Sequence, residues 1–188
     1  MTKIKLTDLK RELKVLDNKE LINLITELYK QNKDVQQFLS NKFIGEEAII
    51  DLYEKTKKKV EEAFFPERGL PKLRINDAKN EITNFKKLST DEYRTVDLML
   101  FFVENGTKYT NTYGDIDSKF YSSMITMYDK VVDECNKNED FFTSFKERLY
   151  SVVQKSEGIG WGYHDCIYDI YYSLDYELED DDEWVECT

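Results

Sequence analysis

The chain has 188 residues, 40% apolar and 35% charged, with only 7 glycines and 2 prolines. This length fits one domain with a sizeable core, and the scarcity of turn residues argues against an all-β sandwich. The net charge is −11, which opposes general attraction to nucleic acid. The three cysteines are odd in number, widely spaced and without a CxxC pair, which argues against a disulfide framework and indicates the cytoplasm.

The first 65 residues predict an N-terminal helical lobe. Apolar residues recur every three to four positions from Leu6 to Leu16, in the pattern of an amphipathic helix. Asp17 and Glu20 have the spacing of a capping box that opens a second helix. Two further stripes, over residues 34–44 and 46–64, complete the lobe.

Residues 66–75 predict a linker, because both prolines fall in this segment. A basic segment, residues 55–87, surrounds it and suggests contact with nucleic-acid phosphates, with an anionic protein or with the chain's own acidic tail. The alternative is a solvated helix face. The candidate residues of this basic patch are Lys57, Lys58, Lys59, Arg68, Lys72 and Arg74.

Residues 76–178 predict a C-terminal helical lobe that packs with the first lobe as one globular unit. Asn76 is a candidate helix cap, and Ser89 with Glu92 repeats the capping-box spacing. The next helix contains the apolar run 98–103 and is apolar on several sides, so we expect it to be central. That run is the longest in the chain, and its six residues fall far short of the roughly 20 that cross a bilayer, so we expect no membrane association.

Three more helices are expected, beginning near Asp117 or Ser118, near Asn138 or Glu139, and after Gly162. The pattern predicts an all-α fold of eight or nine helices, either an antiparallel bundle or a short α-α superhelical array. Residues 179–188 form an acidic tail, for which a run of like charges predicts disorder.

A glycine-rich loop at residues 158–165 is the first candidate ligand pocket. Its glycines permit close backbone approach just before a helix, where free N–H groups hold anions. Trp161 and Tyr163 offer rings for stacking, and His164 and Asp165 follow at once. The alternative is a tight turn in which Trp161 fills the core.

A second loop at residues 113–118 could contribute to the same pocket. Tyr109 and Tyr113 share a helix face, and Asp115 and Asp117 follow a glycine. If these carboxylates converged with His164 and Asp165, they would suit a hard cation. The alternative is a glycine stop at Gly114 followed by a capping Asp117, and we assign no metal and no cofactor.

Aromatic residues concentrate in the second half, where 11 of the 13 tyrosines lie between residues 93 and 176. They cannot all face one core, which suggests contact with a protein or a small ligand. The leading hypothesis is a helical interaction or scaffold module that uses this aromatic half. The alternatives are a nucleic-acid-associated protein using residues 55–87, and a metal-dependent or small-molecule enzyme at the two glycine loops, although no convincing catalytic set is present.

The chain resembles a bacterial family of small, mostly helical proteins defined as a domain of unknown function. The resemblance is carried by residues 9–16, 20–25, 65–69, 113–117 and 158–165, and it covers most of residues 5–175. It implies a helical fold in the bacterial cytoplasm and no particular activity.

Overall fold

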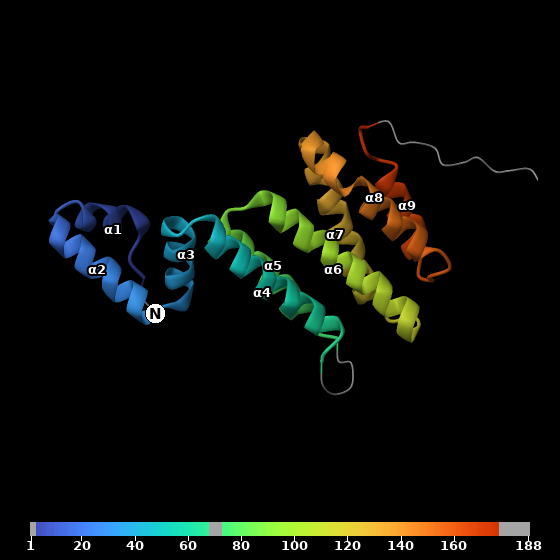
Figure 1. The fold of residues 1–188 in the computed structure, drawn as a ribbon, viewed down its shortest axis with the longest axis horizontal. Coiled ribbons are helices and arrows are strands. Elements are labelled where there is room, and N and C mark those ends of the chain that lie inside the picture. Colours follow the sequence, from blue (N-terminus) through green and yellow to red (C-terminus); the bar gives the residue numbers. More distant parts are fainter. Residues whose placement is uncertain (1–2, 68–72, 177–188) are drawn as a thin grey trace, which may run out of the picture. The chain divides into compact units, whose positions relative to one another are not determined.

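The computed structural model describes residues 3–67 and 73–176 (Figure 1). Every regular element in these ranges is a helix, which confirms the all-α prediction. The described helices are α1 (Leu6–Leu13), α2 (Asn18–Gln31), α3 (Lys33–Phe43), α4 (Glu46–Phe64), α5 (Ile75–Ser89), α6 (Glu92–Tyr113), α7 (Ser118–Lys137), α8 (Glu139–Ser156) and α9 (Tyr163–Tyr171). No helix in these ranges combines the length and apolar character needed to cross a bilayer.

The chain divides into two compact units, residues 1–51 (unit 1) and 52–188 (unit 2). This division assigns most of α4 to unit 2. The lobe boundary expected at the prolines, residues 66–75, is a different division and stays a prediction. Residues 68–72 of that segment, and the acidic tail from residue 179 on, lie outside the described residues.

Unit 1 follows local signals in the sequence. The capping box before α2 is present: the Glu20 N–H donates to Asp17 Oδ1 at 2.8 Å, and the Asp17 N–H donates to Glu20 Oε2 at 2.9 Å. Asn32 caps α3 by accepting from the N–H of Asp34 at 2.8 Å. However, α1 and α2 contain no buried residue, and the only one in α3 is the polar Asn41.

Unit 2 is organised around α6, as the apolar run predicts. This helix contacts α5, α7 and α8, and Figure 1 shows it between α4 and α5 on one side and α8 and α9 on the other. Phe102 of α6 is fully buried and meets the ring of Phe64 edge-on at 5.3 Å. Gly106 allows α7 to approach closely, because a β-carbon at this position would overlap the Met124 thioether. Side chains along α6 are therefore enclosed on several sides, as a central helix requires.

Two predicted helix caps are wrong. α5 begins at Ile75, one residue before Asn76, and no side chain caps it. Asp91 rather than Ser89 caps α6, since Asp91 Oδ1 accepts from the N–H of Arg94 at 2.9 Å. Ser89 is the last residue of α5. Asp91 lies two residues closer than Ser89 to the orphan N–H groups of α6 and carries a charged acceptor, so it takes the capping position.

Candidate functional site

The two glycine loops meet in the structure. A β-carbon at Gly160 would lie 3.0 Å from Asp115 Oδ2, so the loops are in contact there. The Tyr121 hydroxyl donates to Asp115 Oδ1 at 2.9 Å, and the Tyr121 ring packs on Tyr163 at 5.2 Å between centroids. The Tyr163 hydroxyl is hydrogen-bonded to Thr107 at 2.8 Å. Buried tyrosines thus join the ends of α6, α7 and α9.

The polar candidates of these loops face different partners. Asp117 caps α7, because its Oδ1 accepts from the Phe120 N–H at 2.9 Å. His164 Nδ1 pairs with the Ser156 hydroxyl at 2.9 Å, and Asp165 is exposed in the first turn of α9. Within residues 3–67 and 73–176, no three His, Cys, Asp or Glu side chains gather closely enough to hold a metal ion. The enzyme hypothesis therefore has no shared set of metal ligands among these residues.

The aromatic candidates separate into buried and exposed groups. Tyr109 is buried against Tyr113, with ring centroids 4.7 Å apart. Trp161 is 61% exposed, so the alternative in which it fills the core is wrong. Tyr168 and Tyr172 are also exposed and lie 4.4 Å apart on the surface of α9.

Burial dominates the electrostatics of the tyrosines. It raises the pKa of Tyr128 and Tyr163 well above the ordinary phenol value. Partial desolvation, with the neighbouring Tyr168 hydroxyl, raises the pKa of Tyr172 to about 12. All three phenols therefore stay protonated near neutral pH, where they donate hydrogen bonds rather than act as bases.

The basic patch predicted before the prolines is engaged by neighbouring groups. Lys57 Nζ donates to the Tyr53 hydroxyl at 3.0 Å. Lys58 pairs with Glu67 at 2.9 Å, and Lys59 pairs with Glu81 at 2.9 Å.

Of the remaining patch residues, the structure describes only Arg74. The Arg74 guanidinium donates to the Glu62 carbonyl oxygen at 3.1 Å, while Arg68 and Lys72 lie outside the described residues. Nearby carboxylates thus neutralise the described lysines Lys58 and Lys59, which lowers their attraction for phosphate.

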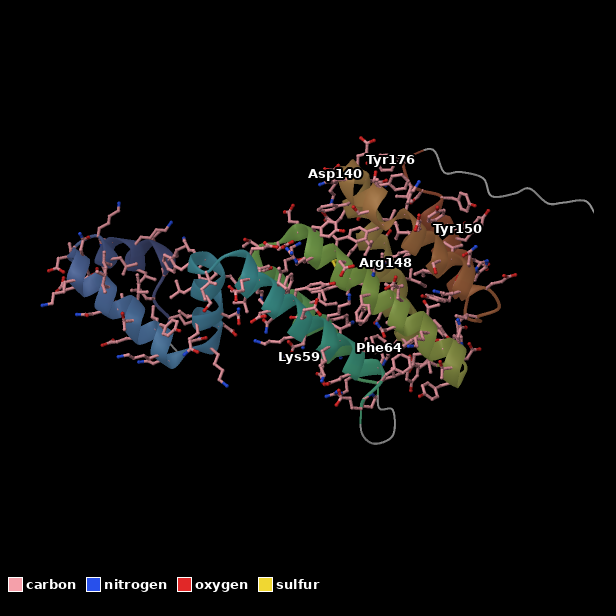
Figure 2. All side chains as sticks on the ribbon, in the orientation of Figure 1. Lys59, Phe64, Asp140, Arg148, Tyr150 and Tyr176 are labelled. Atoms are coloured by element: carbon pink, nitrogen blue, oxygen red, sulfur yellow. The ribbon has the colours of Figure 1, made fainter. Side chains whose placement is uncertain are left out.

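Sequence reasoning missed a charged network inside unit 2. Arg148 of α8 (Figure 2) donates to Glu104 through both Nε and Nη2, each at 2.8 Å. It also pairs with Asp97, and the same carboxylate accepts from the Tyr53 hydroxyl of α4. The sequence offered one signal, Asp97, which is an acid directly before the apolar run of α6. In the structure its side chain is only 8% exposed. Such a buried acid predicts a partner.

This network ties three helices together and holds its charges in fixed states. Burial alone lowers the pKa of the Arg148 guanidinium, but hydrogen bonds and charge from Glu104 and Asp97 outweigh it, and the net shift is upward. Burial, and then the hydrogen bond to Asp97, raises the pKa of Tyr53. The network is an internal ion cluster, so its groups are satisfied by one another rather than by a ligand.

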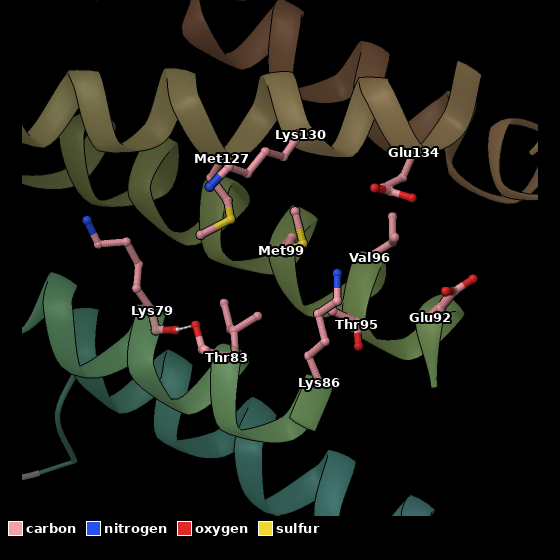
Figure 3. A pocket seen from close by; sticks show the side chains of 11 residues that line it. Lys79, Thr83, Lys86, Glu92, Thr95, Val96, Met99, Met127, Lys130 and Glu134 are labelled. Atoms are coloured by element: carbon pink, nitrogen blue, oxygen red, sulfur yellow. Dashed lines mark hydrogen bonds between the residues drawn. The ribbon is translucent and has the colours of Figure 1, made fainter. Parts of the chain in front are cut away.

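A groove between α5, α6 and α7 is a candidate site (Figure 3). Its cavity has a volume of about 370 Å³. The floor is apolar and is made by Ile82 of α5, Val96 and Met99 of α6, and Met127 of α7. Each of these four side chains is at most 9% exposed, so the floor is the edge of the core. Two thioethers on it suit a surface that adapts to an occupant.

Three lysines stand around this floor. Lys79 and Lys86 are seven residues apart on α5 and so share one face of that helix. In Figure 3 the Lys86 side chain rises from α5 toward α6, and Lys130 and Met127 both extend from α7. Glu92 and Glu134 line the far end of the groove.

The lysines differ from the basic patch in their partners. Lys79 Nζ approaches only the neutral Ser123 hydroxyl, at 3.3 Å. Within the described part of the chain, no hydrogen bond or ion pair engages the ammonium groups of Lys86 and Lys130. Glu134 at the far end pairs with Lys137 at 3.0 Å. The groove therefore combines an apolar floor with uncompensated positive charge.

The comparisons with known proteins add a family and no activity. Residues 3–175 match the model of a protein family described as a family of unknown function (DUF6155). No curated protein and no solved structure matches the chain.

Proposed function

The chain belongs to this family of unknown function, and we propose that it is a helical binding module whose α5–α7 groove holds an acidic, amphipathic segment of a protein partner. The observation that carries the proposal is an apolar floor bordered by three lysines that form no ion pair within residues 3–67 and 73–176. An apolar side chain of the partner would desolvate Met99 and Met127. Carboxylates beside it would pair with the ammonium groups and fix the register.

The geometry of the groove sets the pattern of the expected segment. Lys79 and Lys86 are separated by seven helical residues, or roughly 10 Å along α5. A segment with carboxylates on both sides of one large apolar residue can therefore meet both lysines while the apolar residue contacts the floor. This pattern is typical of segments that bind with an apolar anchor and a charged rim.

The test uses the 188-residue chain with ¹³C-labelled methionine methyl groups and a short synthetic peptide that carries glutamates on both sides of a tryptophan. We expect the peptide to shift the Met99 and Met127 methyl signals, with affinity that falls as salt is added. The combined change Lys79→Gln, Lys86→Gln and Lys130→Gln should weaken binding by about tenfold or more, since one or two close charge contacts are worth this much.

The matched control is Lys87→Gln, because Lys87 is exposed beside Lys86 but does not line the groove. It should leave the affinity unchanged. Equal binding of a peptide with glutamines in place of its glutamates, or an equal loss of affinity in the Lys87 control, would refute charge recognition at the groove.

A second contact surface is favoured by the exposed rings of α9 and the loop before it. Trp161, Tyr168 and Tyr172 are 61%, 45% and 43% exposed. Large exposed aromatic side chains are enriched in the centres of protein interfaces. Through this surface, the aromatic C-terminal half of the chain would contact a partner, as the leading hypothesis from the sequence proposes. Nucleic-acid association through the basic patch has less support, because acids pair with two of its lysines, Lys58 and Lys59.

A further inference from the structure

The described chain ends at the C-terminal end of α7, the helix that carries Met127, Lys130 and Glu134 into the groove. The ring of Tyr176 stacks on Phe142 with centroids 4.2 Å apart, and its hydroxyl donates to the Cys135 carbonyl oxygen at 3.0 Å. The Asp175 N–H donates to Asn136 Oδ1 at 3.0 Å. These contacts fix residues 175–176 at the C-terminal end of α7. Figure 2 labels Tyr176 at this place in unit 2.

The residues that follow are long enough to reach the groove floor. α7 carries Met127, Lys130 and Glu134 into the groove, and Met127 lies eight residues, or about 12 Å, before Cys135 along the helix. Trp184 lies eight residues beyond Tyr176, and an extended chain of that length spans up to roughly 26 Å. The segment between Tyr176 and Trp184 is therefore longer than the offset along α7, which leaves enough chain to pass around α7 and bring Trp184 to the floor.

The composition of this segment complements the groove. Residues 177–188 contain seven acids and no lysine or arginine, and the apolar residues among them are Leu178, Trp184 and Val185, with Cys187 following. The acids flank Trp184, as the proposed binding pattern requires. The groove supplies three ammonium groups around an apolar floor. Of the two acids that line the groove, Glu134 forms an ion pair with Lys137.

We infer that residues 177–188 of the chain itself occupy the α5–α7 groove, with Trp184 on the Met99–Met127 floor and the flanking acids on the lysines. The inference rests on the proposed function, because it assigns the same groove an internal competitor. A partner segment must then displace the tail before it binds. The tail raises the partner concentration required and excludes weakly acidic competitors, since its effective concentration at the groove is high.

The experiment places a nitroxide spin label on Cys187 of the full chain. Cys166 is exposed and is replaced by serine, whereas Cys135 is buried. Burial, and then the charge of Glu134, raises the pKa of the Cys135 thiol to about 12, so this thiol does not react. We expect the label to broaden the Met99 and Met127 methyl signals at low salt and the broadening to disappear as salt is added.

Matched variants separate tail docking from chance proximity. Lys79→Gln with Lys86→Gln and Lys130→Gln should abolish the broadening, whereas Lys87→Gln should preserve it. Neutralising the tail with Asp180→Asn, Asp181→Asn, Asp182→Asn and Glu183→Gln should abolish it as well, and should strengthen binding of the synthetic acidic peptide by about tenfold.

The outcomes distinguish the two proposals. Unbroadened Met99 and Met127 signals in the full chain, with the peptide still shifting them, would refute tail docking and leave the groove function standing. Failure of the peptide to bind even when the tail acids are neutralised would refute the groove function itself. Broadening that survives the triple lysine variant would refute the charge pairing on which both depend.

Discussion

Units 1 and 2 contain helices of the same kind but differ in what those helices bury. Apolar stripes of helical period run through both. Within the described residues, every buried apolar side chain except Ala48 belongs to unit 2. In unit 1, apolar side chains such as Ile22, Val15 and Phe43 stay 64%, 78% and 79% exposed. An apolar stripe on a helix can thus be buried, but it becomes part of a core only where neighbouring elements pack against it.

The difference arises from the number of neighbours that each helix has. α6 contacts α5, α7 and α8, while the main pair in unit 1 is α2 with α3. Two short helices can cover only one side of each stripe, whereas a central helix is covered on several sides. Unit 2 should therefore carry most of the chain's stability, and three experiments test that comparison.

Alkaline pH should have the largest effect, and it should act on unit 2. Burial raises the pKa of the Cys135 thiol to about 12 and that of Tyr128 and Tyr163 above the ordinary phenol value. Groups with a raised pKa in the folded state favour folding fully below their unfolded pKa values, about 8.5 for cysteine and 10 for tyrosine. That advantage is lost as the pH rises toward the folded values.

We therefore expect unit 2 to lose most of its stability by about pH 12, in one cooperative step. Phenolate absorbance and helical ellipticity, measured together, should change in the same pH range. Ionisation of the buried tyrosines without loss of helix would contradict this interpretation.

Removing a core ring should have the next largest effect. Phe102→Ala should lower the free energy of unfolding by about 3–5 kcal/mol, because it leaves a cavity at the centre of α6. Leu24→Ala in the half-buried stripe of α2 should cost roughly 1 kcal/mol or less. Urea unfolding followed by circular dichroism measures both changes. Equal losses for the two variants would show that unit 1 has a core of its own.

Removing a guanidinium should have a smaller effect that again differs between units. Arg148→Met leaves the buried carboxylate of Asp97 and that of Glu104 without a cation, and should cost about 2–3 kcal/mol, below the range for a fully buried pair because Arg148 is partly exposed. Arg11→Met in unit 1 removes only exposed pairs, with Asp8 and Glu12, and should change stability by less than about 0.5 kcal/mol. Thermal unfolding of both variants gives the comparison, and Arg148→Lys should recover only part of the loss, since a lysine cannot bond Glu104 through two nitrogens.

Much of the fold was readable from the sequence because its signals are local. The Asp17–Glu20 capping box and the Asp117 cap formed as predicted, since both depend only on neighbouring N–H groups. The cap predicted at Asn76 is wrong because α5 begins one residue earlier. The cap predicted at Ser89 is wrong because Asp91 occupies the capping position of α6. The central role of α6 followed from an apolar run too wide for a one-sided helix.

The candidate site was less predictable, because proximity between distant residues leaves no periodic trace. The sequence suggested that the loops at residues 113–118 and 158–165 could meet, but only the coordinates could show the contact between Gly160 and Asp115. The Arg148 network joins residues 44 and 51 positions apart, and only Asp97 hinted at it. The groove was overlooked because Lys79 and Lys86 looked like part of a general basic segment, and Met127 looked like ordinary core.

The sequence alone determined that this chain is helical, where most of its helices begin and which helix lies at the centre, because these features depend on side-chain period and on hydrogen bonds a few residues long. The tertiary structure alone decided which lysine ammonium groups form ion pairs with a carboxylate and which do not. Lys59 on α4 pairs with Glu81, whereas Lys86 and Lys130 border an apolar floor and form no ion pair within the described residues, although Glu92 and Glu134 line the far end of the groove. That choice depends on which helix faces are brought together, and Coulomb interactions act through space rather than along the chain.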